Sequence, residues 1–144
     1  NAGNQRWVGN VRGGWMDAGL AHVMEERLDG LCTNFCYQEQ NSGIDFRGGR
    51  WKKAVRSMCK TNQWVPLATV MGRNTNTLTA PEHAQAFSIV EFLLSRGADD
   101  FARVVGILKA KRPARDALRE VYDENILEFE QAWRAWVLET YSSR

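Results

Sequence analysis

The chain has little net charge, no long apolar run and few cysteine and histidine residues. Its 19 Lys and Arg against 17 Asp and Glu leave a formal charge of +2 over 144 residues, too small to demand a nucleic acid or a membrane surface as partner. The longest apolar runs span only a few residues, as in 88–94, so no membrane-spanning helix is expected. No N-terminal stretch has the pattern of a signal peptide. We therefore predict no membrane partner, and nucleic-acid binding is disfavoured.

The scarcity of cysteine and histidine limits the chemistry available to the chain. Three Cys permit at most one internal disulfide. Cys32 and Cys36 would share one face of a helix, and Cys59 is the long-range partner for either. This spacing matches structural zinc sites poorly, so free thiols, one disulfide and lastly a metal remain as alternatives. Two isolated His, His22 and His83, support no Ser–His–Asp set. No cofactor is predicted.

Residues 1–14 differ from the rest of the chain. The chain begins Asn1-Ala2-Gly3, which resembles the remnant of a cleaved expression tag at residues 1–2; a naturally processed terminus is the alternative. Four Gly between Gly3 and Gly14 predict an irregular segment. Residues 15–144 have the length of a single domain with one hydrophobic core.

Helical periodicity and capping signals divide residues 15–144. Apolar spacing predicts helices over 15–28, with Leu28 on the apolar stripe, and over 50–62 and 67–71. Thr79 and Glu82 predict a capping box for a helix that ends at Gly97. Further helices are expected from about 98 to 108, 113 to 122 and 125 to 141. The sequence thus predicts a mainly α domain of about six helices, with at most a minor β element. The segment 31–38 is the candidate for that element, with a helical turn as the alternative.

Two finer expectations concern helix packing. Gly106 lies inside a predicted helix, where it costs about 1 kcal/mol relative to Ala; such a glycine often marks close packing between helices. The connections after Thr79 are short, so neighbouring helices are expected to pack antiparallel.

Several segments resemble one enzyme family. Trp15–His22 is similar to the W-L-x-E-G-x-A segment of gluzincin-type zinc metallopeptidases, the peptidase MA-like group. Trp64–Leu67 resembles that group's short lP-x-l segment, and Glu82–Leu94 resembles its Y-x-q-a-x-s-l-v-x-f-L helix. The order continues through 101–108 and 117–118 to the Trp-rich 129–136. The resemblance covers roughly residues 15 to 141 and implies the C-terminal helical half of such a domain.

The zinc ligands of that family are missing from this chain. In the family, two His of an H-E-x-x-H helix and the Glu of W-L-x-E-G hold the zinc. No H-E-x-x-H occurs in these residues, and the Glu position corresponds to Ala18. Asp17 is adjacent but points about 100° away on a helix, and a register shift that uses Asp17 is the alternative. The resemblance therefore implies a non-catalytic, degenerate or truncated peptidase-like domain that contributes a peptide- or protein-binding surface.

Two other interpretations stay open. The first is an active zinc peptidase whose H-E-x-x-H segment lies outside this chain. The second is a helical interaction module. Because loss of the zinc half exposes apolar surface, a homodimer is also expected. Family members are often exported, but the compartment of the parent is left open. This chain alone is predicted to be inactive.

Asp17, His22 and His83 are the candidates for contacts to a ligand or a cleft. His22 next to Glu25 and Glu26 has the spacing of a metal site; the alternative is a surface His with local ion pairs. The resemblance places His83 where the family often has Tyr, which can stabilise an oxyanion. The alternative for His83 is a water-exposed residue at a helix N-terminus.

A basic stretch without acidic residues runs from Arg47 to Lys60. A binding face for an acidic partner or a phosphate would consist of Arg50, Lys52, Lys53 and Arg56. The alternative is the solvated face of an amphipathic helix. Trp133 and Trp136 are expected in the core rather than in a ligand groove.

Overall fold

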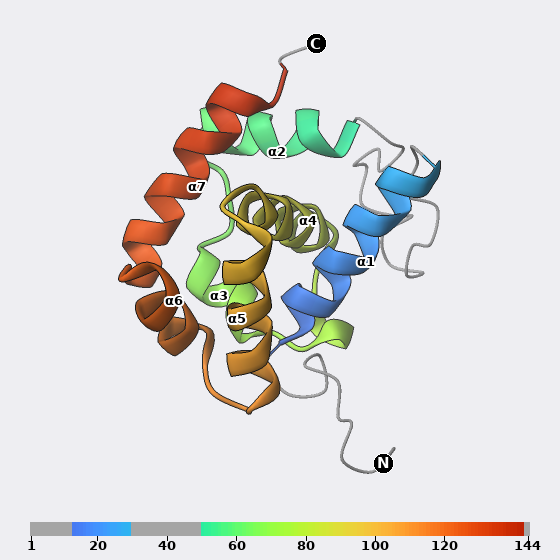
Figure 1. The fold of residues 1–144 in the computed structure, drawn as a ribbon. Helices are drawn as coiled ribbons and strands as arrows, with labels where there is room; N and C mark the ends of the chain where they lie inside the picture. The colour runs from blue at the N-terminus through green and yellow to red at the C-terminus, as the bar shows by residue number, and fades with distance from the viewer. Residues whose placement is uncertain (1–12, 30–49, 143–144) are drawn as a thin grey trace.

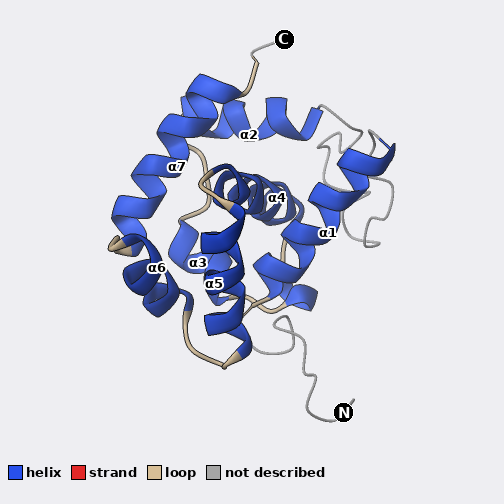
Figure 2. Ribbon diagram, in the orientation of Figure 1, coloured by secondary structure: helices blue, strands red, loops and turns tan. Residues whose placement is uncertain are grey.

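The computed structural model describes residues 13–29 and 50–142, which contain seven α-helices, one short 3₁₀ helix and no strand (Figures 1 and 2). The predicted mainly α class is confirmed, and α-helices lie in all seven predicted ranges, one more than the predicted total of about six. Residues 1–12 and the candidate β segment 31–38 lie outside the described residues, as do Cys32, Cys36 and Arg47. The helices are α1 (Gly14–Asp29), α2 (Arg50–Lys60), α3 (Leu67–Gly72), η4 (Thr75–Thr77), α4 (Ala80–Ser95), α5 (Ala98–Lys109), α6 (Ala114–Tyr122) and α7 (Ile126–Thr140).

Helix α4 lies at the centre of the fold. Figure 1 shows it end-on, with α1, α2, α5 and α7 around it. Its burial is not confined to one stripe but extends around most of its circumference. His83, Gln85 and Ser88 are buried together with the apolar positions because each has a polar partner inside the protein. The polar residues of α4 therefore belong to the core.

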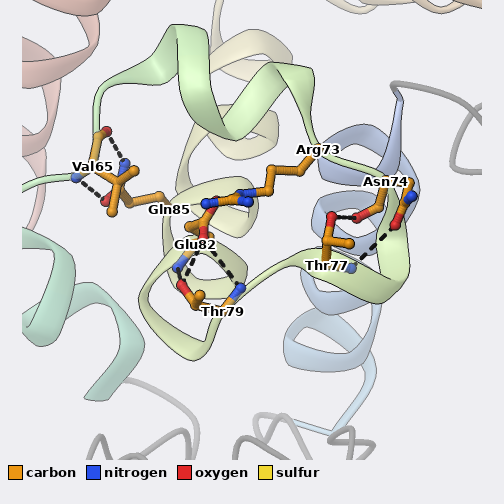
Figure 3. Close-up of polar contacts among 7 residues, drawn as sticks. All are labelled: Val65, Arg73, Asn74, Thr77, Thr79, Glu82 and Gln85. Atoms are coloured by element: carbon orange, nitrogen blue, oxygen red, sulfur yellow. Dashed lines mark hydrogen bonds and ion pairs between the residues drawn. The ribbon is translucent and has the colours of Figure 1, made fainter.

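The start of α4 is fixed by local polar contacts. Thr79 Oγ1 accepts a hydrogen bond from the backbone N–H of Glu82, and the Glu82 carboxylate accepts the N–H of Thr79 in return (Figure 3). The predicted capping box is thereby confirmed. Arg73 also donates from Nε to Glu82 at 2.9 Å. A second capping box, between Asn125 and Glu128, begins α7.

Gln85 attaches the extended segment before α3 to α4. Its side-chain Oε1 accepts from the backbone N–H of Val65 at 2.7 Å, and its Nε2 donates to the carbonyl of Val65 at 2.8 Å (Figure 3). Glu130 of α7 completes the attachment by accepting the N–H of Leu67 at 2.8 Å. These three bonds satisfy backbone groups that no helix satisfies.

Helices α1 and α4 approach each other closely. A Cβ at Gly19 would lie well under 3.0 Å from the carbonyl oxygen of Ala86, so only glycine permits this contact. The first half of α1 buries Trp15 and Met16 against the core. The last turn extends past α4 in Figure 1, and Leu28 is 77% exposed. The prediction that Leu28 belongs to the buried stripe is therefore wrong.

The expectation for Gly106 is wrong, and the antiparallel expectation fails for α4 and α5. Gly106 is exposed, and nothing lies within 4 Å of the place a Cβ would take, so it marks no close contact. Gly97 adopts a φ of 122° between α4 and α5, and α5 then crosses α4 instead of running antiparallel to it (Figure 1). A short connection limits the separation of two helices but does not fix their angle.

Candidate functional site

The structure brings the two histidines of the chain together. His22 lies on α1 and His83 on α4, and His22 Nε2 is 3.1 Å from His83 Nδ1. Their exposed fractions are only 4% and 5%. The ring of Trp51 from α2 covers His22, with ring centroids 4.6 Å apart. The alternatives that placed His22 on the surface and His83 in water are therefore wrong, because close packing of α1 on α4 buries both rings.

Burial controls the charge of this pair. Desolvation lowers the pKa of His22 to about 4. The pKa of His83 also falls to about 4, mainly through burial and further through His22, while Glu82 acts in the opposite direction. Both rings are therefore neutral near pH 7, and one donates the shared hydrogen bond to the other. His22 Nδ1 also lies 3.4 Å from the Glu25 carboxylate.

The side chains around the pair do not form a zinc site of the family's kind. Ala18, which the resemblance places at the position of the third ligand, is 7% exposed and has only a methyl group. Asp17 lies beside it in the first turn of α1, partly exposed. Within ranges 13–29 and 50–142, no three His, Cys, Asp or Glu side chains come together as a metal-binding group. These residues do not supply the three protein ligands that a catalytic zinc site needs.

The predicted basic face of α2 is divided. Lys52 turns toward α1 and α4, where its Nζ lies 3.0 Å from Glu26 and 3.7 Å from Glu91. These carboxylates raise the pKa of Lys52 against the opposing effect of burial. Lys53 is exposed and Arg56 is partly buried. Arg50 is the first residue of α2. The four residues thus do not present one continuous set of unpaired cations.

An open pocket of about 530 Å³ lies where α1, α2, α4 and α7 meet. Lys52 and Glu91 contribute to its lining, together with Trp136 and Tyr141 near the end of α7. Sequence reasoning missed this pocket, because its residues come from four separate helices. The one sequence signal for the pocket was the pair of tryptophans on the last helix, Trp133 and Trp136. Trp133 is fully buried, as expected, but Trp136 is half-buried and lines the pocket.

A hydrogen-bonded chain connects the pocket to the core. Tyr141 donates its hydroxyl to Glu91 at 2.8 Å and lies 3.1 Å from Ser88 Oγ. Trp133 Nε1 donates to the same Ser88 oxygen at 2.9 Å. Burial and the neighbouring Glu91 raise the pKa of Tyr141 well above its ordinary value, so its hydroxyl stays protonated. These bonds hold Tyr141 and Glu91, which both line the pocket, in one arrangement.

Cys59 is a buried free thiol, and burial raises its pKa to about 12.

Over the described ranges, no helix has both the length and the apolar character needed to cross a membrane.

Comparison of the chain with protein-family models, with curated proteins and with solved structures gives no match. The likeness to gluzincin-type peptidases therefore depends on the sequence segments described above and remains a proposal.

Proposed function

We propose that this chain is a non-catalytic, peptidase-like helical domain that provides a binding surface for a peptide or protein. The observation that supports it is the side chain at position 18. If the resemblance holds, this position must supply a carboxylate to zinc, yet Ala18 offers a methyl group buried against the core. A metal held by fewer than three protein ligands is not a family-type catalytic site.

The histidine pair supports the same proposal. A general base needs a pKa near the working pH and access to the substrate. His22 and His83 have pKa values of about 4 and are almost completely buried. The two rings instead form a structural contact between α1 and α4.

Metal analysis and a hydrolysis assay test this proposal. We expect no stoichiometric zinc and no chelator-sensitive peptide cleavage from the chain as it stands. In a longer form that includes upstream sequence, we expect Ala18→Glu to bring zinc uptake that the unmodified form lacks. Ala21→Glu is the matched control, since Ala21 is exposed on the same helix. Stoichiometric zinc with cleavage in the unmodified longer form would overturn the proposal in favour of an active peptidase.

The basic-face interpretation has its own test. Because Lys52 is already paired with two carboxylates, an acidic partner would depend mainly on the remaining cations. Salt-sensitive binding that is lost in Lys53→Ala and Arg56→Ala but kept in Lys109→Ala would establish this face as the binding surface.

The homodimer expected from the sequence stays a prediction. Large apolar side chains that are exposed in the described ranges include Met24 and Leu28 in the second half of α1. Sedimentation velocity over a range of concentrations is the direct test, and a sedimentation coefficient independent of concentration, at the monomer value, would contradict the prediction.

A further inference from the structure

The pocket between α1, α2, α4 and α7 has the size and composition of a ligand site. Its volume of about 530 Å³ falls among pockets that hold small ligands, roughly 300–1,000 Å³. Such pockets combine an apolar lining with a few fixed polar groups. Here Leu94 and Trp136 provide apolar surface, while Arg27, Lys52 and Glu91 provide charge.

The charges of the pocket differ in how far they are already neutralised. Lys52 lies between Glu26 and Glu91, and Glu91 also accepts the hydroxyl of Tyr141. Arg27, in the last turn of α1, is exposed. Among the described residues no carboxylate forms an ion pair with Arg27. A cationic ligand would have to displace Lys52 from Glu91, whereas an anionic ligand at Arg27 displaces no carboxylate of the described residues.

Trp136, which forms part of the apolar wall, packs against two other aromatic rings. The Trp136 ring packs between Phe92 and Tyr141, with centroid distances of 5.3 and 5.2 Å. It is nevertheless only half-buried, so part of the ring surface faces the pocket. Because the hydrogen bonds of Tyr141 fix one of these neighbours, little conformational entropy remains to be lost when a ligand packs on Trp136.

We propose that this pocket binds a carboxylate-bearing peptide segment, with the carboxylate on Arg27 and an apolar side chain between Leu94 and Trp136. This inference rests on the proposed peptide-binding function and names the site and the ligand chemistry. The carboxylate comes from a peptide C-terminus or from an acidic side chain, and both sources present the same group to the guanidinium.

Calorimetric titration with four N-acetylated peptides tests the assignment. The first is acetyl-Gly-Ser-Gly-Leu-Phe with a free C-terminal carboxylate, and the second is its C-terminal amide. The third and fourth are amides in which Glu or Lys replaces Ser. We expect the free-carboxylate peptide, the Glu amide or both to bind at least about tenfold more tightly than the neutral amide, as one charge-assisted hydrogen bond predicts. Which of the two binds identifies the source of the carboxylate.

Two variants connect the binding to the pocket. Arg27→Gln should remove the advantage of the carboxylate peptides, and an unchanged urea midpoint will show that the variant is folded. Lys109→Gln is the matched control, because Lys109 is also an exposed cation in the last turn of a helix, and it lies outside the pocket lining. It should leave binding unchanged.

Three results would overturn the assignment: no peptide binding at about 1 mM, preference for the Lys peptide, or equal binding by Arg27→Gln and the unmodified protein. Failure of the proposed function looks different, since it would appear as stoichiometric zinc and peptide cleavage. Peptide binding that persists in Arg27→Gln but is lost in Lys53→Ala would keep the peptide-binding function and remove this pocket from it.

Discussion

His22 and His83 share a buried hydrogen bond of 3.1 Å although 61 residues separate them in the chain. The contact joins α1 to α4 and requires at least one neutral ring, because two imidazolium rings offer no acceptor. Charged groups that act on the pair include Glu25 beside His22 and Glu82 beside His83. Protonation of the pair therefore opposes the packing of the two helices.

Stability should consequently fall in mild acid. The pKa of each His is about 4 in the folded protein, against an ordinary value of 6.5. The unfolded chain therefore binds protons first as the pH drops, and the free energy of unfolding decreases between pH 6.5 and 4, by an amount on the order of 2–5 kcal/mol. Urea midpoints measured across this window check the trend. His83→Gln should make the pH dependence about half as steep, and an unaltered slope would contradict this assignment.

Substitution of two glycines by alanine should have opposite effects. Gly19→Ala places a Cβ against the backbone of Ala86, so we expect a loss of about 1–3 kcal/mol from overpacking. Gly106→Ala places a methyl group in open space within α5, so helix propensity should stabilise the protein by up to about 1 kcal/mol. Urea unfolding of the two variants is the measurement. Equal effects would mean that α1 does not pack on α4 in this register.

Gln85→Leu should be strongly destabilising. The substitution keeps similar volume but leaves the N–H and carbonyl of Val65 without their partners from Gln85. We expect a loss of roughly 2–4 kcal/mol, since each unsatisfied buried group costs about 1–3 kcal/mol. Gln63→Leu is the control; Gln63 is exposed, and its effect should stay within about 0.5 kcal/mol. Similar losses in both variants would contradict the role assigned to Gln85.

Cys59 should resist thiol reagents in the folded protein. Its thiol is buried and its pKa is raised to about 12, so almost no thiolate, the reactive form, is present near neutral pH. In a background with Cys32→Ser and Cys36→Ser, we expect labelling by a disulfide reagent only after urea is added. Rapid labelling without urea would show that the environment of Cys59 is open.

Local signals in the sequence were sufficient for the helix boundaries. Thr79 with Glu82 and Asn125 with Glu128 act over three residues, so their capping boxes follow directly from the order of residues. The buried faces were less accessible to this reasoning. Leu28 fits the apolar spacing of its helix, yet α1 extends beyond the helix that would cover it. Gly19 faces the backbone of another helix, whereas Gly106 faces open space. The local sequence around each glycine does not encode this difference.

The candidate site depends still more on tertiary structure. His22 and His83 meet because two helices pack at a glycine contact, and no short-range pattern places them together. The pocket takes its lining from four helices. Lys52 has the sequence context of a solvated basic face, but carboxylates from α1 and α4 pair with it. In each case the partner residue lies too far along the chain for periodicity to identify it.

The central position of α4 has a consequence for the order of events during synthesis. Its surface is covered from one side by α1, which precedes it, and from another by α7, which follows it. About 45 residues separate the end of α4 from the end of α7, and a ribosome needs roughly 2–9 seconds to add them. During that interval the nascent chain carries a helix whose apolar surface lacks part of its final cover. A chaperone that binds exposed apolar helices would find its target in this chain at that stage.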